Sequence, residues 1–405
     1  MDIVHKLSKQ IPRRWVVVIK YVKQYCYRVV KGRKRIETNH NYKKLSKKDT
    51  HVFFGYYDVS PFNIFTDEIV YCSLKTKENK LHILLSSLSD NSETEIAESR
   101  AWNWQQGCRL RWMPGNNREV VFNDFDGKSY FARVLNIDNR TERRIDAPLY
   151  DISPDGCYGL TIDFERLGVK RPGYGYTCRN YEEHTHNLQE ECIEIVDLKA
   201  NTRKSVLTYN EISAILGNKS NDFSNNYINH ICFSPSGDKF LFFWLSDEIN
   251  ALKAFLLVYD FCTKKTSVLE TQEKVSHYVW EDEDNIICTA CDNKLKEHYY
   301  RYNVSTGTKQ VLNSLCLNQD GHPSIFDKEH ILTDTYPNLM GYQRLYLANI
   351  DKGGYTDILN IYSDCCIEGE MRTDLHPRLN HEKTIVCFDA NVSGYRELYF
   401  LDIQK

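Results

Sequence analysis

The sequence lacks the features of an exported or membrane-spanning chain. Its longest apolar run near the N-terminus, Trp15–Ile19, has five residues, whereas about 20 are needed to cross a bilayer. The segment also lacks the signal-peptide order of charge, apolar stretch and small cleavage site. We therefore expect a cytoplasmic protein that is not an integral membrane protein. A GxSxG nucleophile motif is absent as well, which argues against a propeller attached to a peptidase.

Methionine is scarce, with 4 residues, and zinc-type cysteine spacing is missing. Cys288-x-x-Cys291 is the only CxxC and has no second pair, so we expect the 14 cysteines to be reduced thiols rather than zinc ligands or disulfides. Tyrosine is abundant, with 27 residues, and aromatic residues reach 13%. Rings suit a pleated, half-buried surface, so this bias favours strands.

Acidic residues are nearly absent from the N-terminal part of the chain. Residues 1–48 hold 15 of the 52 Lys and Arg but only Asp2 and Glu37 as acids, about +13, so the remainder carries 37 bases against 53 acids, about −16. The net charge of −3 therefore hides a basic segment followed by an acidic body. Because the basic residues belong to no nucleic-acid-binding module, we do not expect a nucleic-acid partner.

Residues 13–35 (RRWVVVIKYVKQYCYRVVKGRKR) interleave apolar and basic side chains at helical spacing. This pattern is typical of an interfacial helix on an anionic membrane surface, here the inner face of the cytoplasmic membrane. The alternatives are docking on a partner or a solvated tail. Gly32 ends the predicted helix, and Lys43–Lys48 resembles a linker.

A short pattern recurs along the rest of the chain: an apolar residue, a Ser-Pro-x-Gly type of turn, and a run of strand residues. Its clearest copies are FSPSGDKFLFF from Phe233 and ISPDGCYGLTI from Ile152, and looser copies begin at Val59, Trp112, Trp280, Ile325 and Leu379. The spacings are 53, 40, 81, 47, 45 and 54 residues. Units of this length are typical of four-stranded propeller blades, and the long interval indicates an insertion.

A second element, strand–polar turn–strand, follows in most units, as in VLNIDNRTERRI from Val134, and suits the two outer strands of a blade. The last unit ends after its third strand, so the N-terminal side must supply the fourth, which we expect at His51–Gly55. The sequence thus predicts an all-β, seven-bladed β-propeller over residues 50–405, preceded by a basic amphipathic segment and linker over 1–49.

Histidines recur at one phase of this repeat. Three residues before the aligned apolar position stand, blade by blade, Tyr56, Arg109, Leu149, His230, His277, His322 and His376. First strands line a propeller's channel, so these side chains are expected to converge there, where imidazoles bind a transition metal or transfer protons. The alternative is a structural ring of buried imidazoles. Asp320, Asp374 and Asp389 are candidates to orient the rings, or simply turn residues.

Aromatic, amide and guanidinium side chains cluster in three further segments, FFGYYD (53–58), WNWQQG (102–107) and PGYGY (172–176) in the insertion. Such groups bind sugar rings and carboxylates, although packing between blades would explain some of them. The candidate substrate-binding residues are Tyr57, Gln105, Gln106, Arg109, Tyr174, Tyr176 and Arg378.

The repeats, together with DGHPS around His322, TDLHPR around His376 and NHICFSP around His230, resemble the oligogalacturonate lyase family and other TolB-like propellers. That resemblance implies a seven-bladed propeller that cleaves uronate-containing oligosaccharides by β-elimination. It also implies a divalent, manganese-like metal held by histidines and a glutamine, with an arginine and a histidine that transfer protons.

Carried over by position, the resemblance assigns His277, His322 and His376 to the metal and His230 to proton transfer. Arg171 and Arg179 are candidates for the catalytic arginine, and Tyr56 for protonating the departing oxygen. The family's His-x-His with a preceding Gln is not reproduced, since Met371, Arg372 and Asp374 precede His376. The metal set is therefore incomplete unless Asp374 or Gln105 substitutes.

The function expected from these residues is metal-assisted β-elimination on a uronate-containing oligo- or polysaccharide, within bacterial surface-polysaccharide metabolism. A growing enediolate charge must be neutralised in such a reaction, and a metal or a cationic group can do this. The alternative is a non-catalytic, glycan-binding or scaffolding propeller that docks at the cytoplasmic membrane.

Overall fold

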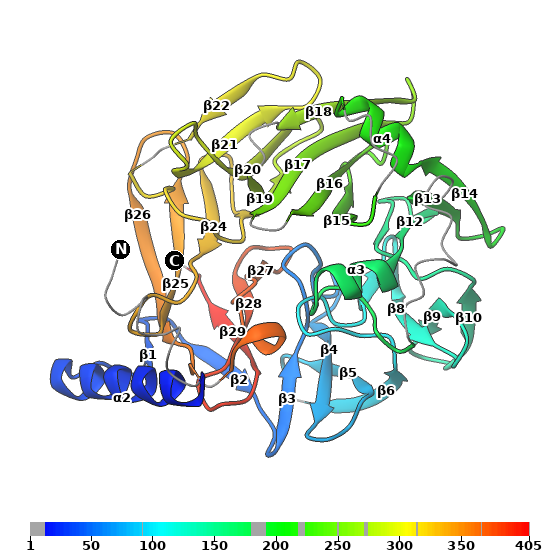
Figure 1. The fold of residues 1–405 in the computed structure, drawn as a ribbon. Coiled ribbons are helices and arrows are strands. Elements are labelled where there is room, and N and C mark those ends of the chain that lie inside the picture. Colours follow the sequence, from blue (N-terminus) through cyan, green and yellow to red (C-terminus); the bar gives the residue numbers. More distant parts are fainter. Residues whose placement is uncertain are drawn as a thin grey trace.

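The computed structural model describes residues 13–90, 92–179, 192–217, 223–248, 251–270, 274–312, 315–365 and 367–404. Short apolar runs separated by turns rich in Asp, Asn and Gly form antiparallel strands, and these strands assemble into seven sheets. Figure 1 shows the sheets arranged as blades around a ring. The predicted all-β, seven-bladed propeller is therefore confirmed.

Each blade is described from its innermost strand outward. Blades one to four consist of β3 (Thr50–Phe53), β4 (Glu68–Lys75), β5 (Leu81–Ser87) and β6 (Glu93–Ser99); β7 (Arg111–Met113), β8 (Asn116–Phe125), β9 (Tyr130–Asn136) and β10 (Glu142–Ile145); β11 (Asp151–Ile152), β12 (Tyr158–Ile162), β13 (Ile193–Asp197) and β14 (Thr202–Leu207); and β15 (Asn226–Phe233), β16 (Lys239–Glu248), β17 (Ala251–Asp260) and β18 (Lys265–Glu270).

Blades five to seven complete the ring. They consist of β19 (Val275–Trp280), β20 (Asn285–Cys291), β21 (Glu297–Asn303) and β22 (Lys309–Val311); β23 (Ser324–Ile325), β24 (His330–Asp334), β25 (Tyr342–Asn349), β26 (Tyr355–Tyr362) and the added β1 (Ile36–Glu37); and β27 (Arg378–Leu379), β28 (Ile385–Ala390), β29 (Glu397–Asp402) and β2 (Tyr42–Leu45).

The recurring Ser-Pro-x-Gly segment forms the turn between the first and second strands of a blade. In blade four the Gly237 N–H donates to the Ser234 carbonyl over 2.9 Å, and in blade three Gly156 donates to Ser153 over 2.8 Å. Both glycines have positive φ, 79° and 70°. Because only glycine adopts that backbone region without strain, the turn requires it.

The ring is closed by a different strand from the one expected. β2 pairs with β29 as the fourth strand of blade seven, whereas His51 to Phe53 belong to β3, the first strand of blade one. The predicted donor at His51–Gly55 and the predicted linker at Lys43–Lys48 are therefore wrong. β1 pairs with β26 at the outer edge of blade six, so residues 36–45 extend two blades.

Helices are few. α2 (Arg13–Lys31) lies along the rim of the ring beside β1 and β26 (Figure 1). In the long insertion between β12 and β13, α3 (Phe164–Lys170) begins at Asp163, whose carboxylate accepts the N–H groups of Glu165 and Arg166. α4 (Tyr209–Ile215) follows β14, and a 3-10 turn, η2 (Gly369–Met371), precedes blade seven.

The structure also bears on the predictions about the cysteines and about membrane-spanning segments. Within the described residues, every cysteine is a free thiol, and both members of the CxxC are buried in β20. Over the same residues, none of the helices combines the length and hydropathy that a membrane span requires.

Candidate metal and proton-transfer site

Local backbone irregularities turn the histidines of the inner strands toward the centre of the ring. The pairing of β15 with β16 shifts register around His230, between Asn229 and Cys232. The pairing of β19 with β20 shifts in the same way around His277. His230 and His376 also adopt positive φ, 51° and 47°. Bulges and left-handed residues of this kind re-aim side chains and occur often at functional sites.

The four histidines of one repeat phase lie together. Ring centroids are 4.1 Å apart for His277 and His322, 4.5 Å for His322 and His376, and 6.1 Å for His230 and His277. Tyr56 lies among them, with its ring 4.7 to 6.1 Å from each imidazole. The channel therefore contains a contiguous aromatic and imidazole cluster.

Two of these rings are oriented by a hydrogen bond at Nδ1, which leaves the Nε2 atom of each ring without a partner. His322 Nδ1 lies 2.9 and 3.0 Å from the Asp334 carboxylate oxygens, and His376 Nδ1 lies 3.0 Å from the Gly55 carbonyl oxygen. A carbonyl or carboxylate only accepts, so each Nδ1 carries a hydrogen, and each ring presents a lone pair on Nε2 when it is neutral. Burial disfavours the charged form of His322, but Asp334 outweighs it and raises the pKa of His322, so a metal at its Nε2 would take the place of a proton. Both Nε2 atoms are buried without a hydrogen-bond partner among the described residues.

Asp374 completes a three-residue group with these two histidines. One potential ligand atom each from His322, Asp374 and His376 lies within 4.8 Å of the others, and all three residues are buried. Two imidazoles and a carboxylate suit a divalent transition metal of the Mn, Fe or Zn type. The Nε2 atoms without partners fit that interpretation, and Asp374 is one of the two residues expected to complete the metal set.

His277, assigned to the metal by resemblance, is not in this group. Its Nδ1 lies 3.0 Å from Asp320, whose carboxylate also accepts from Ser276 and Thr289 at 2.7 Å each. Asp320 thus orients His277 rather than His322 or His376. Burial lowers the pKa of His277, although Asp320 opposes the shift.

Gln105, the other candidate for the open position, is used differently. Its side-chain Nε2 donates to the carbonyls of Glu370 and Arg372, both over 3.0 Å. These bonds fix the segment that leads into Asp374. The Arg372 guanidinium in turn lies 3.0 Å from the Asp374 carboxylate and donates to the Tyr174 hydroxyl over 2.8 Å.

The other titratable groups of the cluster are shifted in opposite directions. Burial and the neighbouring His277 hold the pKa of His230 well below its usual value. Burial, with Tyr174 and Tyr57 nearby, raises the pKa of Tyr56. Near neutral pH the two therefore form a neutral imidazole and a protonated phenol, and their Nε2 and Oη atoms are 3.4 Å apart. This pair can accept and donate a proton.

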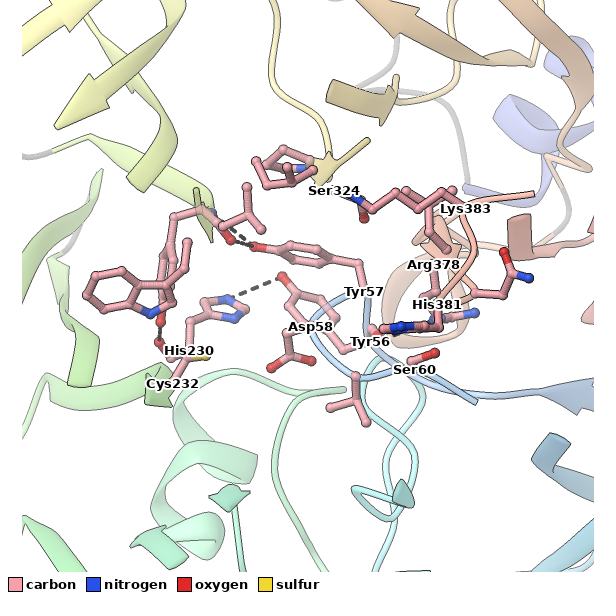
Figure 2. Close-up of a pocket in the computed structure, with 18 residues that line it drawn as sticks. Tyr56, Tyr57, Asp58, Ser60, His230, Cys232, Ser324, Arg378, His381 and Lys383 are labelled. Atoms are coloured by element: carbon pink, nitrogen blue, oxygen red, sulfur yellow. Dashed lines mark hydrogen bonds between the residues drawn. The ribbon is translucent and has the colours of Figure 1, made fainter. Parts of the chain in front are cut away.

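A cavity of about 420 Å³ opens beside this pair. Figure 2 shows Tyr56 and Tyr57 in its wall between His230 on one side and Arg378 and Lys383 on the other. His322, Asp374 and His376 do not line the cavity. A ligand in this cavity would therefore contact the tyrosines, His230, Arg378 and Lys383 rather than the three-residue group.

Arg109 and Arg378, predicted to bind substrate, are both paired with carboxylates inside the protein, and Arg378 also lines the cavity. Arg109 forms a bidentate pair with Asp58, over 3.1 and 3.0 Å. Arg378 donates to the Tyr56 carbonyl over 3.1 Å and pairs with Asp389 over 2.5 Å, with both side chains fully buried. Asp389 thus orients an arginine rather than a histidine.

Most of the remaining substrate candidates are also buried and engaged. Gln106 donates to the Tyr150 hydroxyl over 2.7 Å, and the Tyr57 hydroxyl donates to the Tyr278 carbonyl over 2.8 Å. Tyr176 stacks on Phe164 of α3 and accepts from Asn123. Gln106 and Tyr176 therefore pack in the interior, whereas Tyr57 also lines the cavity.

Two residues of the insertion reach the cluster and one does not. Tyr174 lies edge-on to Tyr56 and His230, at 6.1 and 5.9 Å. The Arg171 guanidinium lies over the Tyr174 ring, 4.9 Å from its centroid. Arg179 is half-exposed and pairs with Glu165, so it lies apart from the cluster.

Sequence reasoning missed Asp334, Tyr150 and Tyr336. The Tyr150 hydroxyl bonds to Gln106, Asn229 and the His230 N–H, so Tyr150 rather than its predicted neighbour Leu149 faces the channel from blade three. A one-residue offset in that blade's alignment would have found it. Tyr336 lies 5.8 Å from His322, in a loop that the repeat does not mark.

A second group of potential ligands, His82, Glu95 and Glu98, lies on the outer part of blade one. Both His82 nitrogens already contact carboxylates, Glu95 at 3.0 Å and Glu78 at 2.7 Å. Burial opposes protonation, but these carboxylates outweigh it and raise the pKa of His82. Because both ring nitrogens of His82 are already engaged, unlike Nε2 of His322 and His376, we do not assign a metal there.

Solved structures of known proteins share this fold. A chain described as oligogalacturonate lyase in complex with manganese is 14% identical with a TM-score of 0.66, covering 91% of this chain and 94% of its own. An oligogalacturonate lyase from Vibrio parahaemolyticus is 12% identical with a TM-score of 0.63, covering 91% and 98%. The propeller domain of the trilobed protease from Pyrococcus furiosus is 13% identical with a TM-score of 0.52, covering 84% and 93%.

No protein-family model and no curated protein matches the sequence. At identities this low, similarity to solved structures establishes the fold alone. The chain thus has the seven-bladed propeller fold of the oligogalacturonate lyases, the fold that its repeat and its histidine motifs predicted.

Proposed function

We propose that this propeller cleaves a uronate-containing oligo- or polysaccharide by metal-assisted β-elimination. The observation that carries the proposal is the paired arrangement in the channel. His322, Asp374 and His376 present a metal-binding group with two orphaned imidazole nitrogens, and Tyr56 and His230 form a proton-transfer pair beside it. The fold shared with lyases, one of them a manganese complex, supports the same reaction class.

The reaction needs a proton to leave the carbon next to a carboxylate. A divalent cation held by His322, Asp374 and His376 would supply neutralisation of the charge that grows on that carboxylate. The neutral imidazole of His230 accepts the proton. As the carbon–carbon double bond forms, the bond to the glycosidic oxygen breaks, and Tyr56 donates its proton to that oxygen.

Proton balance is restored within the same pair. His230 Nε2 and Tyr56 Oη are 3.4 Å apart, so the proton taken from the substrate returns to the phenolate along this contact. Arg171 and Tyr174 lie next to the pair and are suited to position the sugar. Lys383 in the cavity wall attracts the polyanionic substrate.

A second candidate function is supported by one observation. The metal group is buried, and Tyr56 occupies the middle of the histidine cluster. A substrate carboxylate would reach it only after Tyr56 moves. A propeller in which the metal is structural and the cavity binds glycan without cleavage would need no such movement.

Incubation of the purified full chain with uronate glycans and Mn²⁺ distinguishes the two functions. We expect an unsaturated product with ultraviolet absorbance, which is lost in His230→Ala and in the double variant His322→Ala, His376→Ala. The surface variant His330→Ala is the matched control and should retain full rate. If the wild-type protein contains the metal and binds glycan but forms no product, the second function is favoured.

We further propose that the activity belongs to bacterial surface-polysaccharide metabolism on the cytoplasmic side of the membrane. The support is the basic N-terminal segment, which carries about +13 of charge in residues 1–48.

A further inference from the structure

The docked side of α2 is centred on two polar residues, with Val17 and Tyr27 half-buried beside them. Gln24 and Arg28, one helical turn apart, are its most buried side chains, 5% and 7% exposed. The Tyr362 hydroxyl donates to Gln24 over 3.0 Å, and the Arg28 guanidinium lies 4.0 Å from the centroid of the same ring. Lys20 on this side lies 3.1 Å from Glu368. A helix packed on a protein core normally presents its apolar side.

The apolar side of α2 therefore faces outward. Trp15, Val18, Val22, Tyr25 and Val29 follow one another at spacings of three and four residues, so they form one stripe along the helix. Each is between 48% and 63% exposed. Monomeric proteins rarely leave a contiguous apolar stripe of this length uncovered, so the stripe indicates an interaction surface.

The helix is fixed to the rim rather than attached as a loose tail. It ends at Gly32, whose φ is 61°, and the chain then continues into β1. The Tyr362 N–H donates to the Arg35 carbonyl over 2.8 Å, and the Tyr342 hydroxyl donates to the Lys34 carbonyl over 2.9 Å. These contacts hold the stripe at a fixed orientation on the edge of the propeller (Figure 1).

The charge of residues 13–35 indicates what kind of surface the stripe binds. Residues 13–35 contain nine Lys and Arg and no Asp or Glu. A second copy of this helix would bring two such clusters together, and like charges repel. An anionic lipid surface complements them. Trp and Tyr are enriched at the level of the lipid headgroups, and the stripe contains Trp15 and Tyr25.

We propose that α2 lies in the headgroup region of an anionic bilayer, with the stripe Trp15, Val18, Val22, Tyr25 and Val29 inserted and the propeller held edge-on at the surface. This inference does not depend on the proposed lyase activity. It rests on the exposed stripe, the polar docked side and the charge of one segment.

Flotation of the full chain with vesicles tests the proposal. We expect it to float with phosphatidylcholine–phosphatidylglycerol vesicles but not with phosphatidylcholine alone, and to be released by high salt. Val18→Glu with Val22→Glu should lower the bound fraction about tenfold or more. Lys23→Glu with Lys31→Glu should lower it by a similar factor and weaken the salt dependence.

The matched control places the same two charges on exposed leucines elsewhere. Leu295→Glu with Leu339→Glu, at residues 73% and 82% exposed, should bind as the wild type does, and thermal melts check that each variant is folded. Equal binding to neutral vesicles, or no binding to anionic ones, overturns the proposal. So does a wild-type dimer in lipid-free solution that the Val18, Val22 variant dissociates, since the stripe then covers a second copy.

Discussion

At the scale of single residues, the environment of His51 on β3 determines its protonation state. Its ring lies edge-on to Trp104, with centroids 5.1 Å apart, and its Nδ1 accepts the Arg396 N–H over 3.2 Å. Burial, with the Arg396 charge adding to it, lowers the pKa of His51 to about 4. An Nδ1 that accepts is unprotonated, so the hydrogen bond agrees with the lowered pKa.

This shift predicts a pH-dependent stability. Since the unfolded chain takes up a proton near pH 6.5 and the folded His51 only near pH 4, stability is full above pH 6.5 and falls as the pH drops between these values. In urea unfolding, His51→Gln should therefore lose less free energy between pH 7 and pH 5 than the wild type, by up to about 2 kcal/mol. His330→Gln should follow the wild-type profile, and parallel profiles for His51→Gln and the wild type would refute the assignment.

Asp389 predicts a second effect at this scale, because it supports the loop that carries Tyr56. Its carboxylate accepts the Phe54 N–H over 3.1 Å and pairs with Arg378 at full burial. Asp389→Asn leaves a buried guanidinium without its counter-charge, so we expect a loss of about 3 to 5 kcal/mol in unfolding free energy. Asp357→Asn removes the partner of Arg344 at the surface and should cost under about 1 kcal/mol. Similar losses in both variants would contradict this role.

At the scale of elements, two loops touch backbone to backbone beside the cluster. A Cβ on Gly55 (φ 144°) would lie 2.9 Å from the Gln106 carbonyl oxygen, and one on Gly107 (φ 58°) would lie 2.9 Å from the Phe54 carbonyl oxygen. The FFGYYD and WNWQQG segments thus need their glycines for close approach, and the approach places the Gly55 carbonyl against His376.

Gly55→Ala should therefore destabilise the protein and displace His376. We expect a loss of about 2 kcal/mol or more, against about 1 kcal/mol for Gly127→Ala, which has positive φ but no atom within 4 Å of the added methyl. Chemical denaturation measures both variants. If the two cost the same, steric contact between the loops plays no part.

Which elements the sequence could predict depended on how local their signals are. The first-to-second strand turns are encoded by four adjacent residues, as in Ser234 to Gly237, and this repeat was enough to define seven blades. β2 could not be found in this way. Its YKKL sequence carries no strand alternation, and its pairing with β29 joins residues more than 350 positions apart.

The difference between local and long-range signals also explains which parts of the candidate site the sequence could predict. The histidines sit on inner strands, so the repeat phase located them, whereas the groups that orient them come from other segments: Asp334 for His322 and a backbone carbonyl for His376. Sequence does not show that Arg109 and Arg378, both predicted to bind substrate, are buried, and only Arg378 lines the cavity. A buried guanidinium needs a counter-charge, and each of these two arginines pairs with a carboxylate.

For the whole molecule, closure of the ring by the N-terminal segment predicts a sharp boundary in truncation. Removing residues 1–35 leaves β1 and β2 in place, so the propeller should remain folded with only a modest drop in melting temperature. Removing residues 1–47 exposes the edges of β26 and β29 and should cause a large drop and aggregation. Calorimetry and light scattering compare the two, and equal behaviour would contradict closure by β2.

Anomalous diffraction from a crystal soaked in Mn²⁺ tests most directly whether His322, Asp374 and His376 hold a divalent ion. We expect one strong peak bounded by His322 Nε2, His376 Nε2 and the Asp374 carboxylate, and none at His82, Glu95 and Glu98. The peak should disappear in Asp374→Asn with His376→Ala. Absence of a peak at the three residues in the wild type, or a peak only at the His82 group, would contradict the account.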